Sequence, residues 1–148
     1  MDPGDVLTGF GLLMDLVDEI DTLGRADLDT VVAMSSRVRS WHDSFDVRCA
    51  RRARELQRDG KSAGAEAMFN RAGKKSSKEG SAISNRADVG EQLPTFGEGL
   101  ASGDVSAGHL DAIAAVRRRL DDETRQRFDE HEDELLGFAA NERVDVFA

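Results

Sequence analysis

The order of the helices is clearest in residues 76–109, which read SSKEGSAISNRADVGEQLPTFGEGLASGDVSAGH. Ser76 followed three residues later by Glu79 has the pattern of a capping box, so we expect a helix to begin there and to run to about Gln92. The proline at position 94 ends this helix, because the residue before a proline disfavours the helical conformation. One helix with a defined start and a defined end is therefore predicted from local signals alone.

Further caps and stops follow toward the C-terminus. Pro94 suits the first turn of a short helix that ends near Gly103. Ser106 can cap the next helix and Asp121 the one after it, and a last helical segment is expected from about Asn141. The helix that begins at Asp121 is expected to pack through the apolar face Phe128, His131, Leu135 and Phe138.

The N-terminal part of the chain also has apolar residues at helical spacing, over longer stretches. A first helix is predicted from the apolar positions Leu7, Phe10, Leu13 or Met14, Val17 and Ile20, and Gly24 would end it. A long second helix is expected from Asp27, as its N-cap, to about Arg58. We expect it to pack against another long helix, either the first helix or that of a second subunit, through the seam Val31, Met34, Val38, Trp41, Phe45, Cys49 and Leu56.

These signals together predict an all-α fold, a bundle of about six to seven helices with one long helix. The chain has 148 residues, the usual size of one domain. We expect a single helical domain over 1–148, with two long helices in 1–58, a connection with a short helix in 59–75 and a helical subdomain in 76–148. No period-two strand pattern is visible, and the single cysteine excludes an internal disulfide.

Charge is distributed unevenly along the chain. The formal net charge is −9, which by itself argues against a nucleic-acid-binding protein. Residues 1–36 carry 1 basic and 8 acidic side chains, residues 37–78 carry 12 and 5, and residues 79–148 carry 7 and 16. A basic middle segment thus lies between two acidic ones, and such asymmetry indicates where an anionic partner could bind.

Catalytic chemistry has little support in the sequence, so the chain is expected not to be an enzyme and to hold no cofactor or metal. His131-Glu132 begins like the zinc motif H-E-x-x-H, but Leu135 stands where the second histidine is needed. His131 is interpreted as a core histidine, and Cys49 as a small core residue. The acidic run 129–134 is interpreted as a solvated helix face, with a metal-dependent enzyme using these carboxylates as a third hypothesis.

A helix-turn-helix-like corner is predicted around Gly73. A short helix over 62–72, a glycine turn and the capped helix at Ser76 follow one another, and lysines and serines gather at the entry of the second helix. Such a corner can place cations near phosphates and short polar side chains near base edges. The same basic segment includes Arg51, Arg54 and Arg58 on one side of the long helix, where cations also suit the negative end of the helix dipole.

Residues 93–109 resemble a known family. They fit the pattern L-P-x-x-x-x-x-L-A-x-G-x-[IV]-S-x-x-H of the actinobacterial domain-of-unknown-function family 222, which typically precedes an HNH endonuclease domain. The resemblance extends over roughly 25–148 and is strongest over 86–114; upstream Gly73, Ser76, Glu79 and Arg86-Ala87 also fit. Two departures are one extra residue between Gly73 and the serine, and Gly80 where the family usually has alanine.

A shorter resemblance points to ParB-type partition proteins, in which an S-x-G-H segment follows a helix-turn-helix. Residues 106–109 match that segment, and the resemblance implies that His109 is a structural residue at the start of a helix. Double-stranded DNA is therefore the expected partner. The predicted nucleic-acid-binding residues are Arg51, Arg54, Arg58, Lys74, Lys75, Ser76, Ser77, Lys78, Ser81, Asn85 and Arg86.

Two functional hypotheses remain open at the level of the sequence. The first is a non-catalytic, DNA-associated accessory domain that positions or regulates an HNH nuclease, whose motif this chain lacks. The alternative is an oligomerisation or protein-interaction module without nucleic-acid contact, for which the long helix would pair the subunits of a homo-oligomer. We expect a cytoplasmic protein, since the apolar stretch 6–17 is too short to cross a bilayer and lacks a preceding positive charge.

Overall fold

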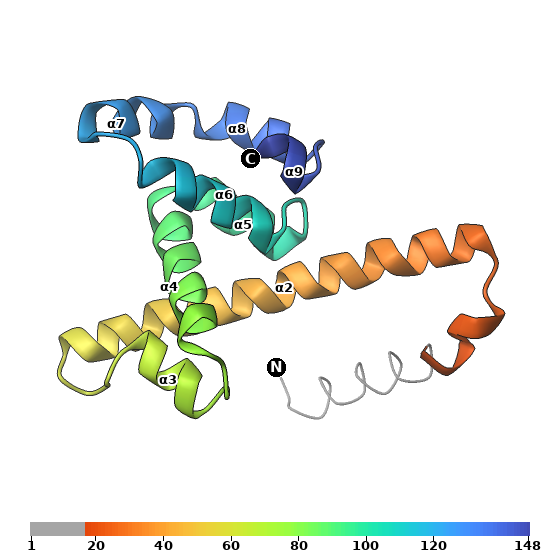
Figure 1. Ribbon diagram of the computed structural model, residues 1–148, viewed down its shortest axis with the longest axis horizontal. Helices are drawn as coiled ribbons and strands as arrows, with labels where there is room; N and C mark the ends of the chain where they lie inside the picture. The colour runs from red at the N-terminus through yellow and green to blue at the C-terminus, as the bar shows by residue number, and fades with distance from the viewer. Residues whose placement is uncertain (1–16) are drawn as a thin grey trace. The chain divides into compact units, whose positions relative to one another are not determined.

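The computed structural model describes residues 17–148 and confirms the all-α prediction, with no strand among them (Figure 1). The chain divides into two units, Met1–Ser35 and Ser36–Ala148. The described helices are η1 (Ile20–Thr22), α2 (Arg25–Arg58), α3 (Ala65–Arg71), α4 (Ser77–Gln92), α5 (Pro94–Ser102), α6 (Ala107–Arg117), α7 (Asp122–Glu130), α8 (Glu132–Ala139) and α9 (Val144–Phe147). No described helix is long and apolar enough to cross a membrane.

The first unit is short within the described residues. The predicted helix through Leu7, Phe10 and Leu13 or Met14 lies outside them. Its predicted end is present, because η1 stops at Thr22 and Gly24 is not helical. The long helix begins at Arg25, slightly before the predicted N-cap Asp27, which lies in its first turn instead, and it ends at Arg58 as predicted.

Local signals set the ends of the helices in the second unit. The Ser76 side chain accepts from the Glu79 N–H, and the Glu79 carboxylate accepts from the Ser76 N–H at 2.8 Å, which completes the predicted capping box. Pro94 occupies the first turn of α5, and Gly103 ends that helix in the left-handed region, with φ at 85°. Asp121 caps α7 through the N–H of Thr124. These starts and stops agree with the sequence prediction.

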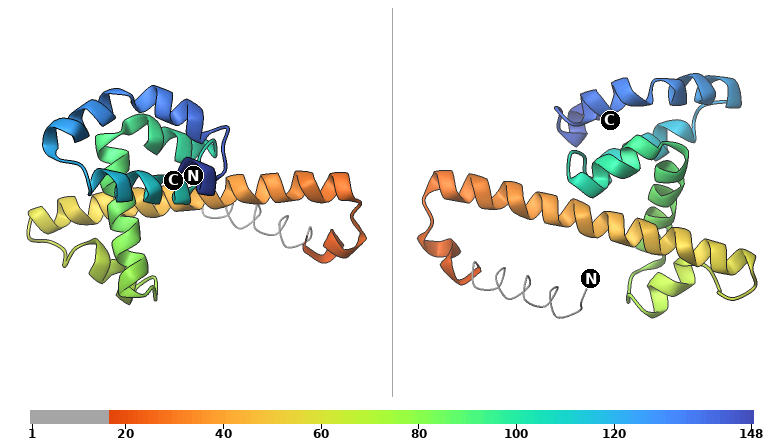
Figure 2. Two further views of the ribbon diagram at one scale, coloured as in Figure 1. Left: turned by 45° about the horizontal axis from the view of Figure 1, so that its top comes forward. Right: turned by 180° about the vertical axis from the view of Figure 1, so that it is seen from behind.

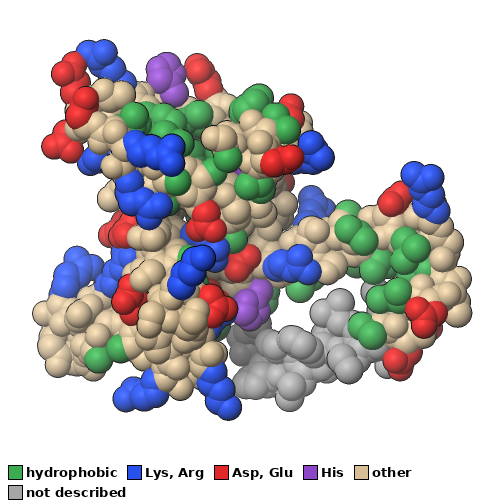
Figure 3. All heavy atoms as spheres, in the orientation of Figure 1, with side chains coloured by type: hydrophobic (Ala, Val, Ile, Leu, Met, Phe, Trp, Pro, Cys, Tyr) green, Lys and Arg blue, Asp and Glu red, His purple; other side chains and the backbone are tan. Residues whose placement is uncertain are grey.

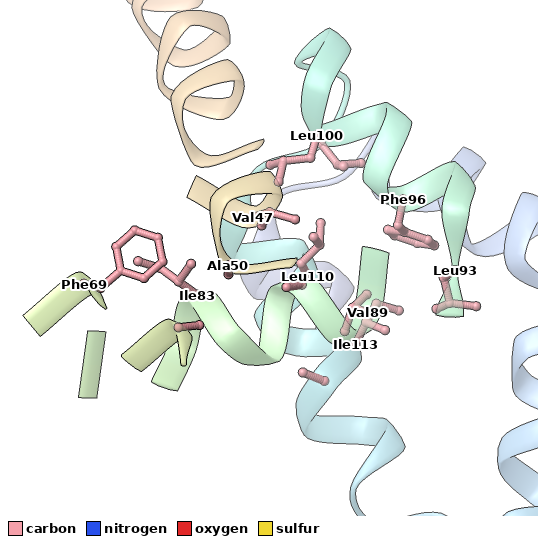
Figure 4. Close-up of a cluster of buried hydrophobic side chains, with 14 of the residues drawn as sticks. Val47, Ala50, Phe69, Ile83, Val89, Leu93, Phe96, Leu100, Leu110 and Ile113 are labelled. Carbon is pink, nitrogen blue, oxygen red and sulfur yellow. The ribbon is translucent and has the colours of Figure 1, made fainter. Parts of the chain in front are cut away.

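The core of the second unit forms where α4 packs against α2, α3, α5 and α6. Figure 2 shows α4 crossing the later part of α2 in both views, and Figure 4 shows side chains from α2, α3, α4, α5 and α6 in one cluster. The largest fully buried side chains are Phe96, Leu93, Leu100, Leu110, Ile113 and Val89. The 93–109 segment thus contributes Leu93, Phe96 and Leu100 to this core.

The face of α2 that packs in this core lies opposite to the predicted seam. The buried side chains of α2 are Ser40, Ser44, Asp46, Val47, Ala50 and Ala53, which we call the inner face. The predicted seam instead exposes Val38, Trp41 and Phe45, each between 45% and 53% accessible. Cys49 lies at the edge and packs partly buried against the core. The predicted seam therefore does not face this core, and its large side chains point away from it.

Glycines let α4 and α5 approach each other closely beside Val47 of the inner face. A Cβ added at Gly90 of α4 would lie 3.9 Å from Val47 and 3.5 Å from Gly97 of α5. A Cβ added at Gly97 would lie only 3.2 Å from the Gly90 carbonyl oxygen. Ala50 and Ala53 of the inner face are buried in the same core, so a much larger side chain at either position would have to displace its neighbours.

The predicted role of His131 was wrong. The helix that starts at Asp122 breaks at His131, and α8 begins at Glu132. The His131 side chain is 65% exposed and lies 3.4 Å from the Glu134 carboxylate. A histidine at the junction of two short helices faces solvent, whereas one uninterrupted helix would have placed it beside Leu135 on the apolar face.

Candidate nucleic-acid interface

The predicted helix-turn-helix-like corner is formed by α3, residues 72–76 and α4. Phe69 of α3 and Ile83 of α4 are buried in the core and hold the two helices together. Gly80 is buried where they meet, and a Cβ there would lie 3.3 Å from the Asn70 side-chain oxygen and 3.5 Å from the Glu66 Cα. The glycine that departs from the family pattern therefore fits the close approach of α3.

The turn between these helices is tight. A Cβ on Gly73 would lie 2.9 Å from the Phe69 carbonyl oxygen, so a side chain at this position would force the turn to shift. Lys74 adopts the left-handed region with φ at 52°, which is uncommon for a residue other than glycine. The next N–H, that of Lys75, donates to the Phe69 carbonyl at 3.1 Å. This geometry fixes how the lysines leave the turn.

Three cations at the corner are exposed. Arg71, Lys74 and Lys78 are accessible, and none forms an ion pair among the described residues. Figure 3, which has the orientation of Figure 1, shows Lys and Arg side chains projecting at its lower edge below α3 and α4. Lys75 differs, since its ammonium lies 3.4 Å from the largely buried Asp46 carboxylate. The free charge therefore comes from the other three residues.

The short polar residues of the corner have partners within the protein. Ser76 belongs to the capping box, and hydrogen bonds from Ser76 hold the pKa of the Glu79 carboxyl below its usual range. The Ser81 hydroxyl donates to the Glu66 carboxylate of α3. Ser77 remains exposed, with its hydroxyl 3.5 Å from the Asn70 amide. Among the predicted hydroxyls, Ser77 is thus exposed and belongs neither to the capping box nor to the contact with Glu66.

Arg86 and Asn85 face other helices rather than the surface of the corner. The Arg86 guanidinium donates to both carboxylate oxygens of Asp111, at 2.8 and 2.6 Å, and lies 4.0 Å from Asp43. This pair ties α4 to α6 and neutralises the predicted cation. Asn85 is half-buried and lines a cavity of about 370 Å³ beside Gln92 and Arg117. Arg86 is therefore already paired within the protein.

Arg51 supplies a hydrogen bond to a backbone carbonyl near the end of α4 that the helix itself cannot supply. In a continuous helix the Gly90 carbonyl would accept from the N–H four residues on, but that residue is Pro94, which has none. The Arg51 guanidinium donates to this carbonyl at 3.0 Å, while its Nε is buried without a partner. A Cβ at Gly90 would lie 3.7 Å from the guanidinium, at ordinary contact distance. Arg51 is a structural residue.

Arg54 has a similar structural role one turn later. Its guanidinium donates to the carbonyl and hydroxyl oxygens of Ser84 and pairs with Asp88, all on α4. Arg58, at the end of α2, is exposed. Of the three predicted arginines of the long helix, the structure leaves only Arg58 available to a partner.

The sequence analysis missed two polar clusters that join distant helices. The buried Arg117 of α6 donates to both carboxylate oxygens of Asp129 on α7, at 2.8 and 2.7 Å, and also contacts Gln92. Arg125 donates to the carbonyl oxygens of Arg117 and Leu120 at the end of α6, at 3.1 and 2.7 Å. The signal available in the sequence was the end of α6, where backbone carbonyls lack helical partners, but the arginine that meets them lies on α7.

His109 has the structural position that the family resemblance implies. Its Nδ1 accepts from the Ser106 N–H at 3.1 Å, which completes a cap for α6. Since Nδ1 accepts, the proton resides on Nε2, which can donate to the Glu142 carbonyl at 3.2 Å. The ring also packs edge-on against Phe147. His109 therefore joins the start of α6 to the C-terminal segment.

Among residues 17–148 no group of three or more histidine, cysteine or carboxylate side chains is placed to hold a metal ion. The acidic run 129–134 is divided by the break between α7 and α8, and Asp129 and Glu132 have other partners. Asp129 pairs with Arg117, and Glu132 accepts from the N–H and hydroxyl of Thr95, both at 2.7 Å.

Comparison with protein-family models, curated proteins and solved structures gives no match.

Proposed function

We propose that this chain is a non-catalytic, DNA-associated helical module that accompanies an HNH-type nuclease. The observation that carries the DNA contact is a group of exposed cations, Arg71 at the end of α3, Lys74 in the turn and Lys78 at the start of α4, with the exposed Ser77 beside Lys78. Phosphate groups are attracted both by these side chains and by the N–H groups and positive dipole at the start of a helix. Arg58 is a further, separate contact.

This proposal includes only some of the predicted DNA-binding residues. Arg51, Arg54 and Arg86 hold helices together, and Lys75 pairs with Asp46. Their loss would disturb the fold rather than remove a phosphate contact. The remaining set is small and lies beside Glu79, so the affinity of this module alone is expected to be low and strongly dependent on salt. A module that positions a nuclease needs such a contact and no chemistry of its own.

The association with a nuclease rests on the resemblance of residues 93–109. In this chain the residues of that pattern have structural roles: Leu93 and Leu100 are fully buried, Gly103 ends α5 and His109 caps α6. The pattern therefore supports a shared fold and assigns no catalytic group to this chain.

The test is a fluorescence-anisotropy titration with duplex DNA at several salt concentrations. The variant Lys74→Asn/Lys78→Gln removes two free cations, and asparagine tolerates the left-handed conformation of residue 74. We expect weaker binding and a fall of about 0.9 in the slope of log K against log salt for each phosphate that the variant no longer neutralises. The matched control Arg118→Gln/Arg119→Gln removes two exposed arginines at the end of α6 and should bind as the wild type does.

Two outcomes would contradict the proposal. Absence of binding by the wild type at low salt would exclude a DNA contact by this module. Equal losses of affinity in the two double variants would mean that DNA responds only to total charge, and the α3–α4 corner would then have no special role.

A further inference from the structure

The exposed face of α2 is apolar and aromatic, and it lies on the side of the helix opposite to the core. We call the residues Val31, Met34, Val38, Trp41 and Phe45 the outer face. Ala50 of the inner face follows Trp41 by about two and a half turns, so the two point in opposite directions. Within the second unit, Val38, Trp41 and Phe45 remain 45%, 47% and 53% accessible. An exposed stripe of this kind indicates an interaction surface.

The aromatic residues of the outer face are already arranged against one another. Trp41 and Phe45 are stacked, with ring centroids 6.4 Å apart and an interplanar angle of 28°. His42 lies beside them, with its ring centroid 6.4 Å from that of Phe45. A preformed aromatic pair on a rigid helix loses little conformational freedom on binding and is typical of the centre of an interface.

The spacing of the outer face has the alternation of three and four residues that is characteristic of a coiled-coil seam. Positions 31, 38 and 45 are one heptad apart, and positions 34 and 41 fall between them. Continued in both directions, the same seam reaches Asp27 toward the N-terminus and Arg48 and Arg52 toward the C-terminus of α2. The seam thus has an acidic start, an apolar centre and a basic end.

This order of charges fits a second copy of the chain in one orientation. In an antiparallel pair centred between Val38 and Trp41, residue i meets residue 79 − i of the second copy. Val38 then meets Trp41 and Met34 meets Phe45, so the central layers are apolar. Farther out, Val31 meets Arg48, and Asp27 meets the oppositely charged Arg52. A parallel pair would instead place Asp27 against Asp27 and Arg52 against Arg52, and like charges in contact are destabilising.

We propose that the outer face of α2 binds the same face of a second copy of this chain, antiparallel, in this register. The inference is independent of the DNA proposal, because the corner at Lys74 and Lys78 contributes nothing to the seam. Two-fold pairing of identical surfaces also satisfies the closed symmetry that most homodimers have. The pair would bury the apolar side chains that the core of the second unit leaves exposed.

The experiment is sedimentation velocity of the full chain over a range of concentrations, with emission from Trp41, the only tryptophan, as a second readout. We expect a species of twice the 16.1 kDa chain mass, with Trp41 emission that shifts to the red as the dimer dissociates on dilution. Trp41→Ser and Phe45→Ser should each raise the dissociation constant by about tenfold or more. The matched control Val146→Ser removes an equally exposed apolar residue of α9 and should leave the constant unchanged.

A charge exchange tests the register. Asp27→Lys and Arg52→Glu, made singly, place like charges together in an antiparallel pair, and each should raise the dissociation constant by about threefold or more. The double variant Asp27→Lys/Arg52→Glu restores opposite charges and should return the constant to about the wild-type value. In a parallel pair the double variant would bring no such recovery, and that result would overturn the register.

Two further results would overturn the pairing itself. One is a monomer at all concentrations with red-shifted Trp41 emission, which would mean that the outer face stays exposed. The other is a monomer whose Trp41 emission is blue-shifted and independent of dilution, in which case residues 1–16 of the same chain would be the occupant. Circular dichroism of each variant separates loss of association from loss of fold.

Discussion

The two faces of α2 differ in the size of their side chains and in what lies against them. The inner face carries serine, alanine and valine and is buried against the other helices of the second unit. The outer face carries the larger Met34, Trp41 and Phe45, each about half accessible. Amphipathicity alone would have placed the large residues inside. The comparison shows that the width of the space between helices, rather than hydrophobicity, selects the buried face.

The first prediction concerns the lack of space on the inner face and should have the largest effect. Ala50 is completely buried, so Ala50→Leu inserts atoms where the neighbouring helices already touch. We expect a loss of roughly 1–3 kcal/mol of unfolding free energy, measured by urea denaturation. The control Ala33→Leu makes the same substitution at an exposed position of α2 and should change the stability little. Equal stability of Ala50→Leu and the wild type would mean that the inner face is not closely packed.

The second prediction separates two adjacent arginines on different sides of α2. Arg51→Met removes the donor to the Gly90 carbonyl and should cost roughly 1–3 kcal/mol, because that carbonyl is left without a partner next to Pro94. Arg52→Met should change stability little, since the Arg52 side chain is 66% exposed and pairs only with Glu55. Equal losses in the two variants, measured at a concentration where the chain is monomeric, would contradict the assigned roles.

The third prediction concerns Asp43, which adjoins the inner face. Burial has the largest effect on the Asp43 carboxyl and raises its pKa above the ordinary value. The nearby Asp46 carboxylate raises this pKa further. The positive charges of Arg86, His42 and Lys75 act in the opposite direction and lower it. The folded state therefore holds this proton more tightly than the unfolded state. Stability contributed by the protonated group is present at low pH and is lost as the pH rises through the folded pKa.

Replacement of this carboxyl tests that sign. Asp43→Asn should gain in stability relative to the wild type as the pH rises from below the ordinary pKa of Asp43 to neutrality, in chemical denaturation at each pH. The same substitution at Asp29, which is exposed, should show no such trend. A relative loss with rising pH would show that attraction to Arg86 outweighs the cost of burial.

The smallest effect is expected on the outer face. Val38→Ser removes an apolar side chain that has no neighbour in the core, so the unfolding free energy of the monomer should change by less than about 0.5 kcal/mol. Thermal denaturation at low concentration measures this change. A large loss in the monomer would mean that a part of the same chain covers this face.

The position of the candidate interface could be predicted from the sequence, but the residues that are free to form it could not. The turn at Gly73 and the cap at Ser76 are local features, so the sequence located the corner and its lysines correctly. The sequence did not indicate that Arg86 would meet Asp111 or that Lys75 would meet Asp46. An arginine close to a basic run resembles a phosphate ligand until the acidic residue that pairs with it is known.

The sequence by itself determined where the helices begin and end. The signals at Ser76 with Glu79, at Pro94, at Gly103 and at Asp121 act within about four residues, and a hydrogen bond or a fixed dihedral angle of that range needs no tertiary structure. Only the tertiary structure decided which face of α2 is buried and which arginines join helices. Those outcomes depend on surfaces contributed by residues far along the chain. A helix with two apolar faces can bury either one, and the neighbouring helices decide which face it is.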